Sequence, residues 1–132
     1  MRARSLKLWL RPGIQARVAI VGSRRRKCKG LVVALVQSLP MDATVVSGGC
    51  PDCADQWAEE EAKRLGLQTD IYRPNTKGLK QYHQIVQAYY ARNRQVALHC
   101  DIMFAFVAKD RTGGTENAIK HAYDLNKEVY IR

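Results

Sequence analysis

Residues 17–26 of this 132-residue chain read RVAIVGSRRR, and this stretch decides the fold. Its first part, Arg17–Val21, is apolar after the initial arginine and ends at Gly22, which is typical of a buried strand. Apolar residues then recur at helical spacing over residues 31–39. The sequence therefore predicts a buried strand, a glycine turn and a helix, the unit from which parallel α/β sheets are built.

The same alternation of strand and helix runs through the rest of the chain. Strands are expected at residues 17–21, 44–46, 69–72, 102–107 and 128–131, and apolar helical stripes at 31–39, 54–65, 82–90 and 118–125. Such alternation favours a Rossmann-like three-layer α/β sandwich with a mainly parallel five-stranded sheet, most commonly in the order 3-2-1-4-5. We expect a single domain over residues 17–132, preceded by a basic arm over residues 1–16.

Glycine-rich loops follow three of the expected strands. Gly22-Ser23 follows the first strand, Ser47-Gly48-Gly49 the second, and Gly113-Gly114-Thr115 the fourth. In the order 3-2-1-4-5 these strands are neighbours, so their loops meet at the carboxyl edge of the sheet, where ligands bind in open α/β folds. We therefore expect Gly22, Gly48 and Gly113 to lie in one cleft.

These loops are composed of residue types that bind phosphate. Each loop precedes a helix, whose first turn offers N–H donors and a partial positive charge. Glycine lets the backbone approach a ligand closely, the serine and threonine hydroxyls add donors, and Arg24 adds charge. None of these groups titrates near neutral pH, so the edge is better equipped to hold a ligand than to react with it.

Four stretches carry a family resemblance in the order in which they occur. They are VAIVGSRRR at 18–26, VVSGGCPDCADQWAEEEAKRLG at 45–66, ARNRQV at 91–96 and CDIMFAFVAKDRTGGTENAIKHA at 100–122. Together they resemble the SLOG superfamily, which includes the Lonely Guy phosphoribohydrolases and the Rossmann-like domain of DNA-processing protein A, and especially its small YspA-like group. The resemblance covers nearly all of residues 17–132 and implies a fold that binds nucleotides or their derivatives.

The resemblance also implies roles for individual residues. Arg92 and Asn93 match an Arg-Asn pair and are expected to bind the ligand. Cys53 stands where the group usually has glycine, and Glu116 directly follows Thr115 where the phosphoribohydrolases have a longer Gly-Gly-x-Gly-Thr-x-x-Glu motif. The expected ligand-binding residues are Gly22, Ser23, Arg24, Ser47, Gly48, Gly49, Asp55, Arg92, Asn93, Gly113, Gly114 and Thr115.

Two functions remain open for such a site, a sensor and a weak enzyme. For an enzyme we expect cleavage of the N-glycosidic bond of a nucleoside monophosphate, a reaction that builds positive charge on the ribose. Glu116 or Asp55 is then the carboxylate that stabilises this charge. Asp55 at the start of a helix also stabilises the helix dipole without any ligand.

The charge distribution indicates a second class of function. The formal net charge is +10, and the first 41 residues hold ten basic residues and no acidic ones. A block of this kind suits a polyanion, so the alternative is a nucleic-acid binding module that uses the arm and Arg24–Lys29. For residues 1–16 alone, the sequence favours a solvated arm that aids solubility.

The apolar runs, the start of the chain and the cysteines indicate in which cellular environment the protein is expected. No apolar run approaches the roughly 18–20 residues of a membrane span, and the start of the chain lacks the pattern of a signal peptide, so we expect a cytoplasmic protein without membrane contact. Reduced thiols are expected for the four cysteines, Cys28, Cys50, Cys53 and Cys100. The C-x-x-C pair of Cys50 and Cys53 favours neither a metal site nor redox chemistry, and no cofactor is expected.

The expected long helix at 82–90 carries more apolar surface than one sheet face covers. Tyr82, Tyr89 and Tyr90 are interpreted as core or interface residues rather than as a platform for base stacking. We therefore expect a homodimer or a higher homo-oligomer.

Overall fold

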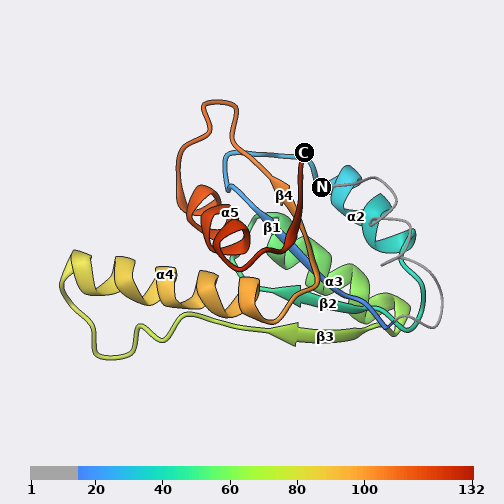
Figure 1. The fold of residues 1–132 in the computed structure, drawn as a ribbon, viewed down its shortest axis with the longest axis horizontal. Helices are drawn as coiled ribbons and strands as arrows, with labels where there is room; N and C mark the ends of the chain where they lie inside the picture. The colour runs from blue at the N-terminus through green and yellow to red at the C-terminus, as the bar shows by residue number, and fades with distance from the viewer. Residues whose placement is uncertain (1–14) are drawn as a thin grey trace.

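The computed structural model describes residues 15–132, and nearly all of the expected basic arm lies outside the described residues. Five strands alternate with four helices in this part of the chain (Figure 1). The strands are β1 (Arg17–Gly22), β2 (Thr44–Ser47), β3 (Gln68–Ile71), β4 (Ile102–Phe106) and β5 (Glu128–Ile131); the helices are α2 (Lys29–Gln37), α3 (Ala54–Leu65), α4 (Tyr82–Leu98) and α5 (Gly114–Asp124).

The five strands form one all-parallel sheet in the order β3-β2-β1-β4-β5, which confirms the predicted topology. At the centre, β1 pairs with β2 through Val18↔Val45 and with β4 through Val18↔Ile102. All five residues of β4 are buried, as expected for an apolar strand covered on both faces. The carboxyl ends of β1, β2 and β4 therefore lie side by side.

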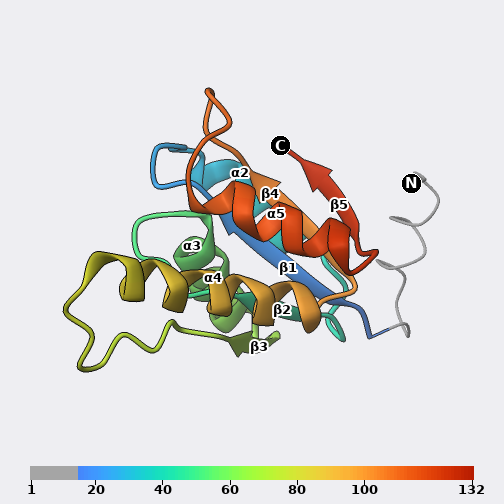
Figure 2. The same cartoon turned by 60° about the vertical axis from the view of Figure 1, so that its left-hand side comes forward.

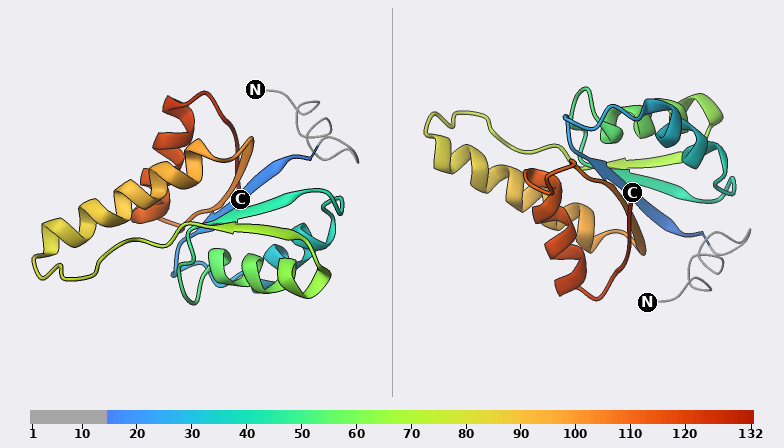
Figure 3. Two further views of the ribbon diagram at one scale, coloured as in Figure 1. Left: turned by 90° about the horizontal axis from the view of Figure 1, so that it is seen from below. Right: turned by 90° about the horizontal axis from the view of Figure 1, so that it is seen from above.

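Each face of the sheet is covered by two helices (Figure 3). On one face, Val18, Ile20 and Phe104 of the sheet pack with buried residues of α2 and α3. On the other face, Ala19 and Met103 pack with buried residues of α4 and α5. Alternate residues of the same strands thus enter different cores, which makes the domain a three-layer sandwich.

The long helix α4 extends beyond the sheet (Figures 1 and 2). Its C-terminal half carries the buried residues Asn93, Val96 and Ala97 and packs beside α5. Its N-terminal half protrudes, and Tyr82 there is 82% exposed. The expected apolar surface on this helix is therefore real, and part of it is not covered by residues 15–132.

Within the described residues, none of the helices combines the length and the apolar character needed to cross a bilayer.

Candidate functional site

A pocket of about 560 Å³ lies at the carboxyl edge of the sheet. The loops after β1, β2 and β4 and the N-terminal half of α4 surround it, and they gather on the left side of the view in Figure 2. Ten of the sequence-predicted site residues line the pocket: Gly22, Ser23, Arg24, Gly49, Asp55, Arg92, Asn93, Gly113, Gly114 and Thr115. Three others, Ser47, Gly48 and Glu116, are not among the lining residues.

Asp55 fastens two of the glycine loops to each other. Its Oδ1 accepts the backbone N–H of Gly22 at 3.2 Å, and its Oδ2 accepts the backbone N–H of Gly48 at 3.0 Å. The side chain is buried, and burial raises its pKa, while the Cys53 thiol and the Arg92 charge oppose that rise. These two N–H groups, expected to face a phosphate, are therefore already bonded to an internal carboxylate.

Ser47 and Gly48 of the second glycine loop are internal structural residues, whereas Gly49 of the same loop lines the pocket. The buried Ser47 hydroxyl donates to the carbonyl of Asp55 at 3.1 Å and accepts the N–H of Gly49 at 3.1 Å. The carbonyl of Gly48 accepts a hydrogen bond from Nη1 of Arg92. A Cβ on Gly48 would lie only 2.6 Å from that nitrogen, so glycine is needed here to let Arg92 pack on the loop.

Arg92 and Asn93 connect α4 with both the second loop and the start of α5. Nε of Arg92 donates to Oδ1 of Asn93 at 2.9 Å, which fixes the guanidinium over Gly48. Nδ2 of Asn93 in turn donates to the carbonyl of Gly114 at 3.2 Å. The two residues that the Arg-Asn motif singled out therefore hold the site together as well as lining it.

Arg25 provides a third connection, between the loops after β1 and β4. Its guanidinium forms two hydrogen bonds with the Asp110 carboxylate, at 2.8 and 3.0 Å, and also bonds to the hydroxyl and the carbonyl of Thr112. The Arg25 interaction holds the pKa of Asp110 well below its usual range. Arg25 lines the pocket, but its positive charge is already paired with the Asp110 carboxylate of this loop.

The start of α5 is the part of the edge best suited to an anion. Gly113 has φ +106°, a conformation that favours glycine, and α5 begins without a side-chain cap. Gly114 and Thr115, in the first turn, line the pocket, and the N–H groups of a first helical turn bind anions. Arg24, which also lines the pocket, contributes a positive charge from the loop after β1.

The two carboxylates considered for catalysis have different positions. Glu116 forms a two-pronged ion pair with Arg111, at 2.8 and 2.9 Å. Asp55 lines the pocket but already accepts three hydrogen bonds, the third from the Cys53 thiol at 3.1 Å. Neither carboxylate is therefore positioned as a free acid or base facing the cavity.

The pocket also has an aromatic wall, which sequence reasoning did not assign to the site. Tyr82, Tyr89 and Tyr90 of α4 all line the pocket and are 82%, 38% and 40% exposed. The Arg92 guanidinium lies 5.8 Å from the centroid of the Tyr89 ring, which positions it between the loop and the wall. Tyr89 and Tyr90 follow Tyr82 by seven and eight residues, a spacing that brings the three rings to one helical face and that could have indicated this wall from the sequence.

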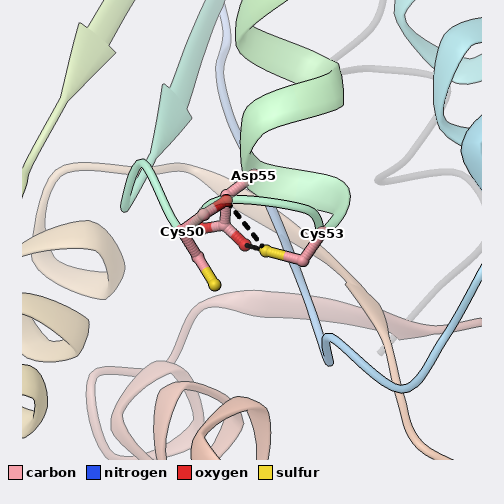
Figure 4. Close-up of side chains that lie close together, drawn as sticks. All are labelled: Cys50, Cys53 and Asp55. Atoms are coloured by element: carbon pink, nitrogen blue, oxygen red, sulfur yellow. Dashed lines mark hydrogen bonds between the residues drawn. The ribbon is translucent and has the colours of Figure 1, made fainter.

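The C-x-x-C pair lies at the junction of the second loop and α3 (Figure 4). Cys50 is partly exposed and lines the pocket, whereas Cys53 is buried and occupies the N-cap position of α3. The sulfur atoms of the two cysteines and a carboxylate oxygen of Asp55 all lie within 4.8 Å of one another. Cys28 and Cys100, also free thiols, do not belong to this group.

Comparisons of the chain with protein-family models, with curated proteins and with solved structures gave no match. The resemblance to the SLOG superfamily therefore rests on the motifs quoted above. The structure itself defines the class of the domain, an all-parallel α/β sandwich of Rossmann type with a pocket at the carboxyl edge of its sheet.

Proposed function

We propose that this domain binds a nucleotide or a nucleotide-derived phosphate ligand in the pocket at the carboxyl edge of the sheet. One observation carries the proposal: an uncapped helix start, an arginine and a wall of three tyrosines line the same cavity. A nucleotide matches both parts of this pocket. Its anionic phosphate suits the helix start and the arginine, and its flat base stacks on aromatic rings.

The contacts suggest how the ligand is oriented. We propose that the phosphate binds at Gly113–Thr115, at the start of α5, which lines the same pocket as the positively charged Arg24. We propose that the base stacks on Tyr89 and its neighbours on α4. A volume of about 560 Å³ falls within the range typical of small-molecule sites.

The same contacts favour binding over turnover. A glycosidase needs a carboxylate that is free to stabilise charge on the sugar or to transfer a proton. Asp55 is engaged by Gly22, Gly48 and Cys53, and Glu116 is engaged by Arg111. We therefore infer a sensor or carrier of the ligand, with N-glycosidic hydrolysis as the weaker activity to be tested on each ligand that binds.

The test is a thermal-shift panel of nucleoside mono- and diphosphates, cyclic nucleotides and ADP-ribose, followed by calorimetric titration of the compounds that stabilise the protein. Saturation at about 100 times the dissociation constant should add about 2.7 kcal/mol to the free energy of unfolding. Free base release, measured by chromatography, reports hydrolysis separately. If no compound in the panel raises the melting temperature, the proposal is wrong.

A matched pair of arginine variants locates the site. Arg24→Ala should weaken binding of the best nucleotide by about tenfold or more, because it removes a charge-assisted contact. Arg64→Ala is the control, since Arg64 pairs with Glu61 on α3 and is not among the pocket residues. Equal affinities for both variants would place the ligand elsewhere.

A further inference from the structure

Cys50 and Cys53 are arranged as an accessible thiol above a buried one. Cys50 faces the pocket, while Cys53 is fully buried, with no exposed surface. Asp52, between them, has φ +55°, and this turn brings the two sulfur atoms within 4.8 Å of each other. A disulfide bond of about 2.05 Å requires the two sulfur atoms to approach each other from this separation, and both belong to the same turn.

The Arg24 guanidinium and the Cys53 thiol stabilise Cys50 as a thiolate. Nε of Arg24 lies 3.3 Å from the Cys50 sulfur. The Cys53 thiol and then Arg24 lower the pKa of Cys50 to about 6, against the effect of partial burial. At pH 7 the thiolate fraction is then about thirtyfold larger than for an ordinary cysteine.

Cys53 has the opposite character and a proton acceptor beside it. Its thiol donates to the carbonyl of Cys50 at 3.1 Å and to Oδ1 of Asp55 at 3.1 Å (Figure 4). The interaction with Cys50, burial and the Asp55 charge all raise the pKa of the Cys53 thiol. Cys53 therefore stays protonated until its proton is removed, and Asp55 is the carboxylate in contact with it.

We propose that Cys50 and Cys53 form a redox-active dithiol that reduces an anionic, low-molecular-weight disulfide entering the pocket. Cys50 is the attacking thiolate, Cys53 is the resolving thiol, and Asp55 accepts the Cys53 proton. The anionic class follows from Arg24, which contacts the Cys50 sulfur, and from Arg92, which lines the same pocket. This inference does not depend on nucleotide binding and fails or succeeds separately from it.

The exchange balances in two steps. The Cys50 thiolate attacks one sulfur of the disulfide RSSR, forming a Cys50–SR bond and releasing RS⁻. Cys53 transfers its proton to Asp55 and attacks the Cys50 sulfur, which forms the Cys50–Cys53 bond and releases the second sulfur. The products are the protein disulfide, two RS⁻ thiolates and protonated Asp55, and two electrons have moved to the substrate.

Trapping with glutathione disulfide tests the assigned roles. The reduced full-length chain is incubated with it, the remaining thiols are blocked with iodoacetamide, and the peptides are analysed by mass spectrometry. We expect a Cys50–Cys53 disulfide in the wild type, a stable glutathione adduct on Cys50 in Cys53→Ser, and no reaction at residue 53 in Cys50→Ser. Cys28→Ser is the control and should behave as wild type.

Some outcomes of this experiment overturn the proposal. One is a wild-type chain that keeps a glutathione adduct without forming the Cys50–Cys53 bond. Another is modification of Cys28 or Cys100 at the rate of Cys50. A third is stoichiometric zinc, found by elemental analysis of the reduced protein, that blocks the exchange, because the pair would then be a metal site.

The pH profile of alkylation gives a second test on the unmodified protein, which needs no variant to fold. The rate of Cys50 modification by iodoacetamide should have its midpoint near pH 6. Arg24→Gln should move this midpoint upward, whereas Arg64→Gln should not. A wild-type midpoint near the ordinary cysteine value of about 8.5 would overturn the role assigned to Cys50.

Discussion

Asp55 and Arg92 hold the same residue from its two polar ends. The Asp55 carboxylate accepts the N–H of Gly48 at 3.0 Å, and the Arg92 guanidinium donates to the carbonyl of Gly48. One of these residues belongs to α3 and the other to α4, which cover opposite faces of the sheet. Gly48 is thus one point at which the two helical layers are joined at the carboxyl edge.

Gly48→Ala should displace the Arg92 side chain and destabilise the protein by about 1 kcal/mol, the value of one hydrogen bond. In an Arg92→Ala background the same change should cost almost nothing, because its steric conflict is with Arg92. Denaturant unfolding of the four proteins measures this coupling. Gly30→Ala is the matched control, since nothing lies within 4 Å of a Cβ there, and it should stabilise α2 by about 0.5–1 kcal/mol.

Asp55→Asn should cost about 1–3 kcal/mol of unfolding free energy. The amide places a donor against one of the two backbone donors, the N–H of Gly22 or of Gly48, in a buried position. Glu116→Gln, the comparison variant, loses only the partly exposed pair with Arg111 and should cost less than about 1 kcal/mol. Similar losses for the two variants would contradict the assignment of Asp55 as the link between the loops.

Much of the fold could be predicted from the sequence because its signals are local. The apolar strands, the glycine that ends α3 and the glycine loops after β1, β2 and β4 all follow from short-range patterns. The interior of the site could not, because the partners of Gly22 and Gly48 are set by where α3 and α4 pack. The sequence accordingly marks Asp55 as a ligand-binding or helix-start residue and the tyrosines of α4 as core or interface residues, but it does not reveal their partners.

Acid stability should depend on Glu61. The Arg64 guanidinium, and then Gln37, lower the pKa of Glu61 to about 2, below the roughly 4.3 of an unfolded chain. The depressed value means that this pair stabilises the protein above about pH 4.3 and that the contribution is lost as the pH falls toward 2. Glu61→Gln should flatten this part of the pH dependence in denaturant titrations. Glu60→Gln, whose partner is the neutral Gln56, should leave it unchanged.

Removal of residues 1–14 should affect nucleotide binding and nucleic-acid binding differently. The pocket consists of residues between Val21 and Ala118, so nucleotide affinity should stay within about twofold of the full chain. Affinity for DNA or RNA should fall, together with its dependence on salt, if the basic residues of the arm contact phosphates. Equilibrium titrations at two ionic strengths measure both. A parallel loss of nucleotide binding would show that the arm contributes to the pocket.

Self-association is predicted from the protruding half of α4. Tyr82→Glu should weaken a homodimer by about tenfold, because it replaces an aromatic side chain that is 82% exposed with a charged one. Met41→Glu is the control, since Met41 is 66% exposed but precedes β2 at the opposite edge of the sheet. Light scattering over a concentration series measures the mass. A strict monomer at the highest concentration would contradict the prediction.

The central position of β1 has a consequence for how the chain is made. Its N–H at Arg17 bonds to Asp101, 84 positions later, and its partner strand β4 begins only at Ile102. A nascent chain therefore exposes one side of its first strand until most of the polypeptide has left the ribosome, and pairing over such separations is slow. The pocket is completed later still, once the start of α5 has been synthesised. A ligand can therefore bind only to chains whose synthesis has passed that helix.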